Sequence, residues 1–212
     1  MIMPYLKNLF LLLFAALALN ACTTLDIDSN RPTGVQHIDN SDPAWQQHLQ
    51  KLNSIQSYRA AGQLGYISAK ERFSTRFDWQ YRNPQAYTLL LSSTISSSTL
   101  KFEMNPQGMT ISDNKGNRRS EADAKMLLRE IVGMDIPLEQ LAFWLKGQPD
   151  TNADYQVGTN HLLAGFSYPL DGTRWTADYL NYHTERAIAL PRDILLKNAA
   201  QTLKIRVDDW QY

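Results

Sequence analysis

The thiol of Cys22 is the most reactive side chain in this sequence, and Cys22 is the only cysteine among 212 residues. An unbroken apolar run of eleven residues, Leu9–Leu19, lies just before it, and Lys7 supplies a positive charge ahead of that run. Eleven helical residues rise only about 16 Å, roughly half of a hydrocarbon core, so the run is too short to span a membrane comfortably. A charged start, a short apolar core and a small residue before the cleavage point are typical of a secretory signal peptide.

The chemistry expected at Cys22 is lipidation. Leu19-Asn20-Ala21-Cys22 resembles the bacterial lipobox, in which the cysteine thiol takes a diacylglyceryl group and cleavage leaves that cysteine first. We therefore expect removal of residues 1–21 and covalent diacylglyceryl and N-acyl groups on Cys22, with no separate cofactor. An ordinary signal peptide before a chance cysteine is the alternative, but it leaves an unpaired thiol in an oxidising compartment. In Gram-negative bacteria an aspartate directly after the lipidated cysteine signals retention in the inner membrane. Thr23 occupies that position here, so we expect the mature protein on the periplasmic face of the outer membrane.

Other reactive groups lack the spacing that catalysis or metal binding requires. There is no Gly-x-Ser-x-Gly elbow, no phosphate-binding glycine loop and no dinucleotide fingerprint. The four histidines, at positions 37, 48, 161 and 183, are too scattered for a metal-ligand motif. Lys plus Arg equals Asp plus Glu at 21 each, so no global field attracts nucleic acid. We therefore expect that the protein is not an enzyme and that it has neither a metal site nor a nucleic-acid partner.

The elements that would position a binding site follow a polar stretch. Residues 22–41 contain Pro and Gly and lack periodicity, which predicts a lipidated N-terminus and a flexible tether. Asp42-Pro43 then predicts a helix N-cap and first turn, so that residues 42–212 form a single domain. Without a disulfide, the stability of this domain must come from burying apolar side chains.

Alternation of apolar and polar residues predicts strands from Tyr58 onward. In Arg72–Tyr81 the side chains of Phe73, Phe77 and Trp79 share one face, and charged side chains share the other. Shorter stretches with the same pattern recur to the C-terminus, and Asn-Pro and Asp-Gly turns separate them. These stretches are typical of an antiparallel sheet with one apolar and one solvated face.

Helical patterns interrupt the strands twice. One helix is expected to start at Ser120, with Asp123 completing a capping box, and the next near Pro137. The sequence thus predicts a mainly β (α+β) fold of about ten antiparallel strands and about three short helices. A sheet of this size twists and curls, so we expect a half-open barrel with an apolar concave face. That face is either packed by the helices or able to admit an apolar ligand, and the pattern alone favours packing.

Short motifs occur along the mature chain in an order that is more specific than any one of them. They are Trp45 with Gln47-His48, Tyr66-Ile67-Ser68, Arg76-Phe77 with Trp79-Gln80, Leu89-Leu90-Leu91, Asp113-Asn114-Lys115-Gly116, Gly133-Met134 with Ile136-Pro137-Leu138, Trp144 with Gly147 and Pro149, and Asp209-Trp210. In this order and spacing they resemble the LolB family, the outer-membrane lipoprotein receptors of the bacterial lipoprotein localisation system.

The resemblance implies a half-barrel that holds acyl chains in a hydrophobic cavity, which reverses the preference for a packed interior. It implies a monomer that accepts lipoprotein cargo from the periplasmic carrier LolA and inserts it into outer-membrane lipid. We expect seven side chains to line the cavity: Leu64, Tyr66, Phe77, Trp79, Leu89, Phe102 and Trp144. Two other functions stay open: a structural assembly lipoprotein that binds protein partners, and a carrier for another amphiphile such as lipopolysaccharide.

The resemblance also assigns a role to Ile95. The family projects an apolar side chain from the loop after the Leu-Leu-Leu strand, and that position falls on Ile95 within Ser93–Ser97. We expect Ile95 to be an exposed knob that enters a bilayer during release. The alternative is that the strand continues and points Ile95 inward, because Ile95 has the parity of Leu89 and Leu91 and the family's proline and glycine are missing.

Overall fold

Twelve strands form a single sheet in the computed structural model, which describes residues 25–28, 34–93, 95–131 and 137–212. The strands are β1 (His37–Ile38), β2 (Tyr58–Ser68), β3 (Arg72–Asn83), β4 (Ala86–Ser92), β5 (Thr99–Asn105), β6 (Gly108–Asp113), β7 (Arg118–Glu121), β8 (Asp154–Gly158), β9 (Leu163–Leu170), β10 (Thr173–His183), β11 (Leu190–Lys197) and β12 (Gln201–Gln211). The described helices are α2 (Pro43–Ser54), α3 (Ala124–Ile131) and α4 (Leu138–Trp144).

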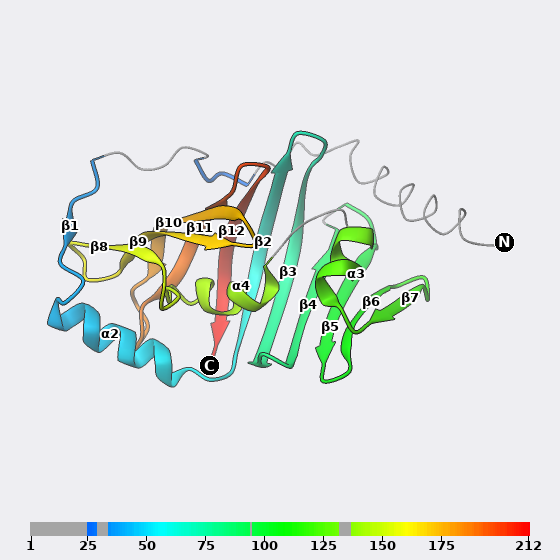
Figure 1. Ribbon diagram of the computed structural model, residues 1–212, viewed down its shortest axis with the longest axis horizontal. Coiled ribbons are helices and arrows are strands. Elements are labelled where there is room, and N and C mark those ends of the chain that lie inside the picture. Colours follow the sequence, from blue (N-terminus) through cyan, green and yellow to red (C-terminus); the bar gives the residue numbers. More distant parts are fainter. Residues whose placement is uncertain (1–24, 29–33, 94, 132–136) are drawn as a thin grey trace.

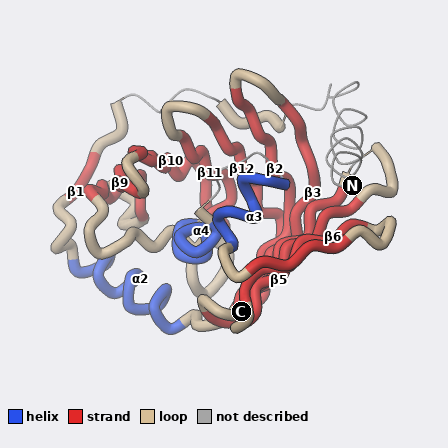
Figure 2. The backbone as a smooth tube through the Cα atoms, turned by 45° about the vertical axis from the view of Figure 1, so that its right-hand side comes forward, coloured by secondary structure: helices blue, strands red, loops and turns tan. Residues whose placement is uncertain are grey.

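The sheet is curved and open along one side. Its strand order is β1-β8-β9-β10-β11-β12-β2-β3-β4-β5-β6-β7, and every neighbouring pair is antiparallel. The edge strands β1 and β7 do not pair with each other in the described part of the chain, so the sheet is a half-open barrel (Figure 1). Figure 2 shows α3 and α4 on the concave side. The predicted fold class, a mainly β half-barrel with short helices, is confirmed.

Alternation along β3 builds the core as the sequence predicts. Phe77 and Trp79 are buried at 5% and 0% exposure, and they point to the concave face. Arg76 and Gln80, one residue away on either side, are exposed on the convex face. Because side chains on a strand alternate with a period of two, the register of the apolar residues decides which face becomes the interior.

The two halves of the sheet meet where β12 pairs with β2. Leu203 lies opposite Tyr66 and Ile205 opposite Leu64, so both strands turn apolar side chains to the concave face. Gly62 lets the two strands approach, because a Cβ at position 62 would lie 2.0 Å from the carbonyl oxygen of Arg206. No side chain fits at that separation without moving the backbone of β12.

Gly62→Ala should therefore destabilise the protein by about 3 kcal/mol or more, the upper end of the overpacking range. Gly65→Ala is the matched control on the same strand, since a Cβ there would lie 3.6 Å from Cβ of Lys204, an ordinary contact. We expect the control to change the free energy of unfolding by less than about 1 kcal/mol. Urea unfolding of both variants measures the difference, and equal stabilities would show that the β2–β12 contact is looser than described.

The start of α3 differs from the prediction. The helix was expected to begin at Ser120, but Arg118–Glu121 forms β7 and pairs with β6. Asp123 is the residue that caps the helix, because its Oδ1 accepts a hydrogen bond from the backbone of Met126 at 3.0 Å. Ser120 instead lies across the strand pair from Thr110, with the two hydroxyls 2.8 Å apart. The sequence contains a capping pattern, but Arg118–Glu121 pairs with β6 as a strand, so the helix begins about one turn later than predicted.

The tether expected over residues 22–41 is fastened to the domain at two places. Leu25 and Ile27 are buried at 7% and 5% exposure, and β1 extends the sheet by pairing with β8. Cys22 lies outside the described residues, so the structure does not test its lipidation. In the part of the chain that is described, no helix combines the length and apolar character needed to cross a membrane.

Candidate functional site

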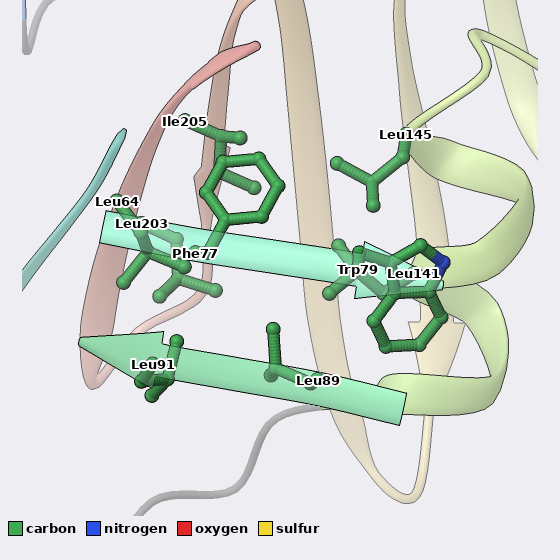
Figure 3. A pocket seen from close by; sticks show the side chains of 9 residues that line it. All are labelled: Leu64, Phe77, Trp79, Leu89, Leu91, Leu141, Leu145, Leu203 and Ile205. Atoms are coloured by element: carbon green, nitrogen blue, oxygen red, sulfur yellow. The ribbon is translucent and has the colours of Figure 1, made fainter. Parts of the chain in front are cut away.

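A small apolar cavity lies between the sheet and α4. Its lining consists of nine apolar or aromatic side chains from β2, β3, β4, β12, α4 and the turn after α4 (Figure 3): Leu64, Phe77, Trp79, Leu89, Leu91, Leu141, Leu145, Leu203 and Ile205. The free space between them is about 20 Å³, room for roughly one water molecule. The concave face is therefore nearly closed in this conformation, and a larger apolar ligand needs α4 or these side chains to move.

Helix α4 is positioned over the cavity by its flanking residues. Pro137 precedes it, and Gly147 ends the following turn with a φ of 75°, a value that favours glycine. Leu141 and Leu145, four residues apart, lie on the same side of the helix and face the sheet. The helix therefore presents apolar side chains to the concave face and forms one wall of the cavity.

Two tyrosines of the sheet hold the last turn of α4. The hydroxyl of Tyr58 donates to the carbonyl of Ala142 at 2.6 Å, and that of Tyr179 donates to the carbonyl of Trp144 at 2.7 Å. The final carbonyls of a helix lack partners within the helix, so Tyr58 supplies a donor to the carbonyl of Ala142. Tyr179 adds a second donor to the carbonyl of Trp144, which also accepts from the backbone N–H of Gly147 at 3.0 Å. Burial raises the pKa of both tyrosines well above the usual value, so both hydroxyls stay protonated and able to donate.

Lys146 connects the turn after α4 to the end of α2. Its Nζ donates to the carbonyls of Leu52 at 3.2 Å and Ile55 at 3.0 Å, and its side chain is only 4% exposed. The ammonium also lies 6.0 Å from the ring centre of Tyr58 and 5.8 Å from that of Phe143. Burial lowers the pKa of Lys146 to about 8. The amino group remains a donor when neutral, so the two carbonyl bonds survive deprotonation.

Stability should rise with pH between about 7.5 and 9. The pKa of Lys146 is about 8 in the folded state and near its ordinary 10.5 in the unfolded chain, so the unfolded chain holds more protons in this window. We expect the wild type to gain about 1 kcal/mol across it and Lys146→Met to gain none. Above about pH 9.5 both proteins should lose stability, because the buried tyrosines have raised pKa values. Urea unfolding at pH 7.5 and 9 measures the difference, and parallel curves would contradict this account of Lys146.

Four of the seven predicted cavity residues, Leu64, Phe77, Trp79 and Leu89, lie together around the cavity. The other three are buried elsewhere in the same core. Tyr66 stacks on Phe73 and its hydroxyl donates to Gln201 at 3.1 Å. Phe102 pairs with Leu89 from the next strand. Trp144 packs against Phe166 and Trp175, and its Nε1 donates to Asp150 at 2.8 Å.

The sequence prediction omitted five lining residues: Leu91, Leu141, Leu145, Leu203 and Ile205. Strand parity indicates Leu91, since it shares the face of Leu89, and the four-residue spacing of Leu141 and Leu145 indicates a common helix face. Leu203 and Ile205 alternate with polar residues, which indicates apolar strand positions. Placing them beside Leu64 requires the β2–β12 pairing, which joins segments about 140 residues apart and has no local signal.

Ile95 lies on the loop between β4 and β5, at 64% exposure. The strand ends at Ser92, so the alternative in which Ile95 continues it and points inward does not hold. The Oγ of Ser93 accepts hydrogen bonds from the backbone of Ile95 at 3.2 Å and of Ser96 at 3.0 Å. Asn114 on the neighbouring turn donates to the carbonyl of Ser97 at 2.7 Å. These bonds order a turn in which the family's proline and glycine are missing.

Comparison with known proteins decides the family. The model of the family described as outer membrane lipoprotein LolB matches residues 56–210. The chain belongs to the LolB family. It is 65% identical to outer-membrane lipoprotein LolB of Mannheimia succiniciproducens, over 99% of this chain and 100% of that protein. It is 62% identical to outer-membrane lipoprotein LolB of Haemophilus influenzae strain Rd, over 96% of each chain. This protein is therefore an outer-membrane lipoprotein.

Solved structures show more distant likeness. A LolA superfamily protein from Nitrosomonas europaea aligns with a TM-score of 0.47 and 12% identity, over 78% of this chain and 92% of that one.

Around the apolar cavity, and elsewhere among the described residues, no group of three or more His, Cys, Asp or Glu side chains could hold a metal ion.

Proposed function

We propose that this protein accepts lipoproteins from the periplasmic carrier LolA, shelters their acyl chains at the concave face and inserts them into the outer membrane. The observation that supports this function is the apolar cavity between α4 and the sheet, because none of its nine lining residues is charged. Acyl chains need such a surface, since each CH₂ removed from water contributes about 0.8 kcal/mol.

Transfer requires only that the carrier, the receptor and the membrane differ in how completely they bury the acyl chains. An advantage of about 1.4 kcal/mol shifts an equilibrium tenfold, so slightly more complete burial in this cavity is enough to draw cargo from the carrier. Release into the bilayer is favourable in turn, because the hydrocarbon core buries the chains completely. No nucleotide or catalytic residue is needed for either step.

In this proposal, α4 is the cavity wall that moves during uptake. The free volume of about 20 Å³ is far smaller than an acyl chain of some sixteen carbons. Leu141 and Leu145 are on the one cavity wall that belongs to a short helix rather than to the sheet. Displacing that helix breaks the bonds from Tyr58 and Tyr179 to its last turn, but it exposes the apolar side chains of β3 and β4 while the backbone hydrogen bonds between the strands stay intact.

Ile95 is the residue that we propose to enter the bilayer during release. Ile95→Glu should leave the binding of acyl chains unchanged, because the loop lies outside the residues that line the cavity. Transfer of lipoprotein into vesicles should fall several-fold, because a charge opposes entry into hydrocarbon. Ser97→Glu is the matched control, since Ser97 is exposed on the same loop and is already polar. Normal transfer by Ile95→Glu would refute this role.

Depletion in a bacterial cell tests the function as a whole. We expect outer-membrane lipoproteins to accumulate in the periplasm, bound to their carrier, or in the inner membrane. Fractionation of membranes, with an integral outer-membrane protein as the reference, measures this directly. Correct lipoprotein localisation after depletion would reject the proposed function and favour a structural role or another amphiphile.

A further inference from the structure

A second apolar cluster lies on the convex face of the sheet, outside the main core. Leu195 of β11 is fully buried at 0% exposure, although its neighbours Ile194 and Leu196 are the residues that point to the core. Gly65 of β2 is also buried on this face. The convex face of such a sheet normally contacts water, so a fully buried leucine there requires a cover.

The segment Leu25–Ile27 lies on this face of the sheet. Both Leu25 and Ile27 are buried, and a Cβ at position 65 would lie 3.9 Å from Cβ of Leu25. Lys204, which pairs with Leu195 across the strands, donates from Nζ to the carbonyl of Ile27 at 2.5 Å. These contacts lie next to one another over β2, β11 and β12.

A second cation fixes the same segment. Nη2 of Arg206 donates to the carbonyl of Asp26 at 3.1 Å, and Nε of Arg206 donates to the buried carboxylate of Asp193 at 2.6 Å. The guanidinium is therefore held by the sheet before it binds the segment. Two buried apolar side chains and two hydrogen bonds to backbone carbonyls define a docked segment, which we call the strap, residues 25–27.

The strap lies near the end of the sheet that bears Ile95. Gly65 is close to the last residue of β2, and Lys204 is close to the first residue of β12. From Gly65 the pairing leads to Ser74 of β3, and Arg76 on that strand pairs with Ser92, where β4 ends before the Ile95 loop. In Figure 1 the short blue segment lies beside this end of β12 and β2.

We propose that the strap places the lipid anchor at the end of the sheet that carries the Ile95 loop, and so holds that end against the bilayer. The inference rests on the proposed lipidation of Cys22. Only Thr23 and Thr24 lie between Cys22 and Leu25, and the three Cα–Cα steps from Cys22 to Leu25 span at most about 11 Å. A lipid on Cys22 thus draws the strap, and the strand ends beneath it, to the membrane surface.

The charges at this end suit a bilayer that contains anionic lipid. The β2–β3 and β6–β7 turns and their flanks present four exposed cations, Lys70, Arg72, Lys115 and Arg118. The acidic groups at this end are the exposed Glu71, the half-buried Asp113, and Asp26 and Asp28, which are exposed in and next to the strap. The half-buried Lys197, Lys204 and Arg206 add three further cations. A net excess of cations near a membrane surface is attracted by phosphatidylglycerol headgroups.

Energy transfer between the protein and the membrane tests the orientation. The lipidated full mature chain is placed in phosphatidylethanolamine–phosphatidylglycerol vesicles that contain a small fraction of rhodamine-labelled lipid. A donor fluorophore is attached at Lys70→Cys, at the strap end, or at Gln107→Cys, on an exposed turn at the opposite end. An 11-residue strand such as β2 spans about 35 Å, so the two ends differ clearly in their distance from the bilayer.

We expect at least twofold more transfer from position 70 than from position 107. Leu25→Ser with Ile27→Ser should release the strap and largely abolish this difference, whereas Val35→Ser, an exposed position in the same tether, should preserve it. Equal transfer from both positions in the strap-intact protein would overturn the proposal, as would a difference that survives the double substitution. Failure to float with vesicles would instead show that Cys22 is not lipidated, and would overturn the proposal together with its premise.

Discussion

Leu141→Asp should weaken the binding of a fluorescent fatty-acid analogue by the soluble form, which lacks Cys22, at least about tenfold. Leu141 is 4% exposed and points from α4 into the apolar cavity. An ionised carboxylate in an apolar cavity costs several kcal/mol, and each 1.4 kcal/mol lost from binding is a factor of ten in affinity. The helix can move outward to hydrate the new charge, because it is the wall that the proposed mechanism already requires to move.

Gln140→Asp is the control for this variant, since Gln140 precedes Leu141 on the same helix, is half-buried and does not line the cavity. Circular dichroism and thermal unfolding show whether each variant retains the half-barrel. We expect the control to bind like the wild type. A folded Leu141→Asp protein with wild-type affinity would mean that acyl chains bind away from α4.

Cys22→Ser should release the protein from the membrane almost completely. A lipoprotein with diacylglyceryl and N-acyl groups is held by three chains, and a single acyl chain already gives measurable membrane binding. The serine variant has no thiol to acylate, so we expect a shift of more than about 100-fold from membrane to soluble fraction. The half-barrel itself should fold as before, because the lining residues all lie beyond residue 63.

Flotation of vesicles after metabolic labelling with radioactive palmitate measures both the binding to membranes and the acylation of Cys22. The wild type should float and contain label, and the variant should do neither. Thr23→Asp is the informative companion, because it leaves the thiol in place and is expected to move the labelled protein to the inner membrane. Label that persists in Cys22→Ser would place the acylation elsewhere in the chain.

Local chemistry made much of the architecture predictable. The Oδ1 of Asp42 accepts from the backbone of Trp45 at 2.9 Å, as expected of an N-cap before Pro43. Alternation in Arg72–Tyr81 identified the face that is buried, because the period of a strand relates neighbouring side chains directly. Features that depend only on residues within one helix or strand could be predicted from the sequence.

Long-range pairing was not predictable in the same way. The β2–β12 contact, the position of α4 and the docking of Leu25 depend on which distant segments meet. Phe102 and Trp144 have the apolar character expected of cavity residues, but their neighbours in the fold bury them away from the free volume. Burial in a core and contact with a ligand have the same sequence pattern, and only the three-dimensional arrangement separates them.

Photo-crosslinking tests directly whether acyl chains occupy the concave face. A photoreactive phenylalanine analogue is incorporated at Phe77, which lines the cavity, or at Gln80, which is exposed on the convex face of the same strand. The soluble form of each variant is then offered a carrier-bound lipoprotein with radioactive palmitoyl chains. If acyl chains occupy the concave face, position 77 gives labelled cross-links and position 80 gives only background. Equal labelling from both positions, or labelling from position 80 alone, would contradict it.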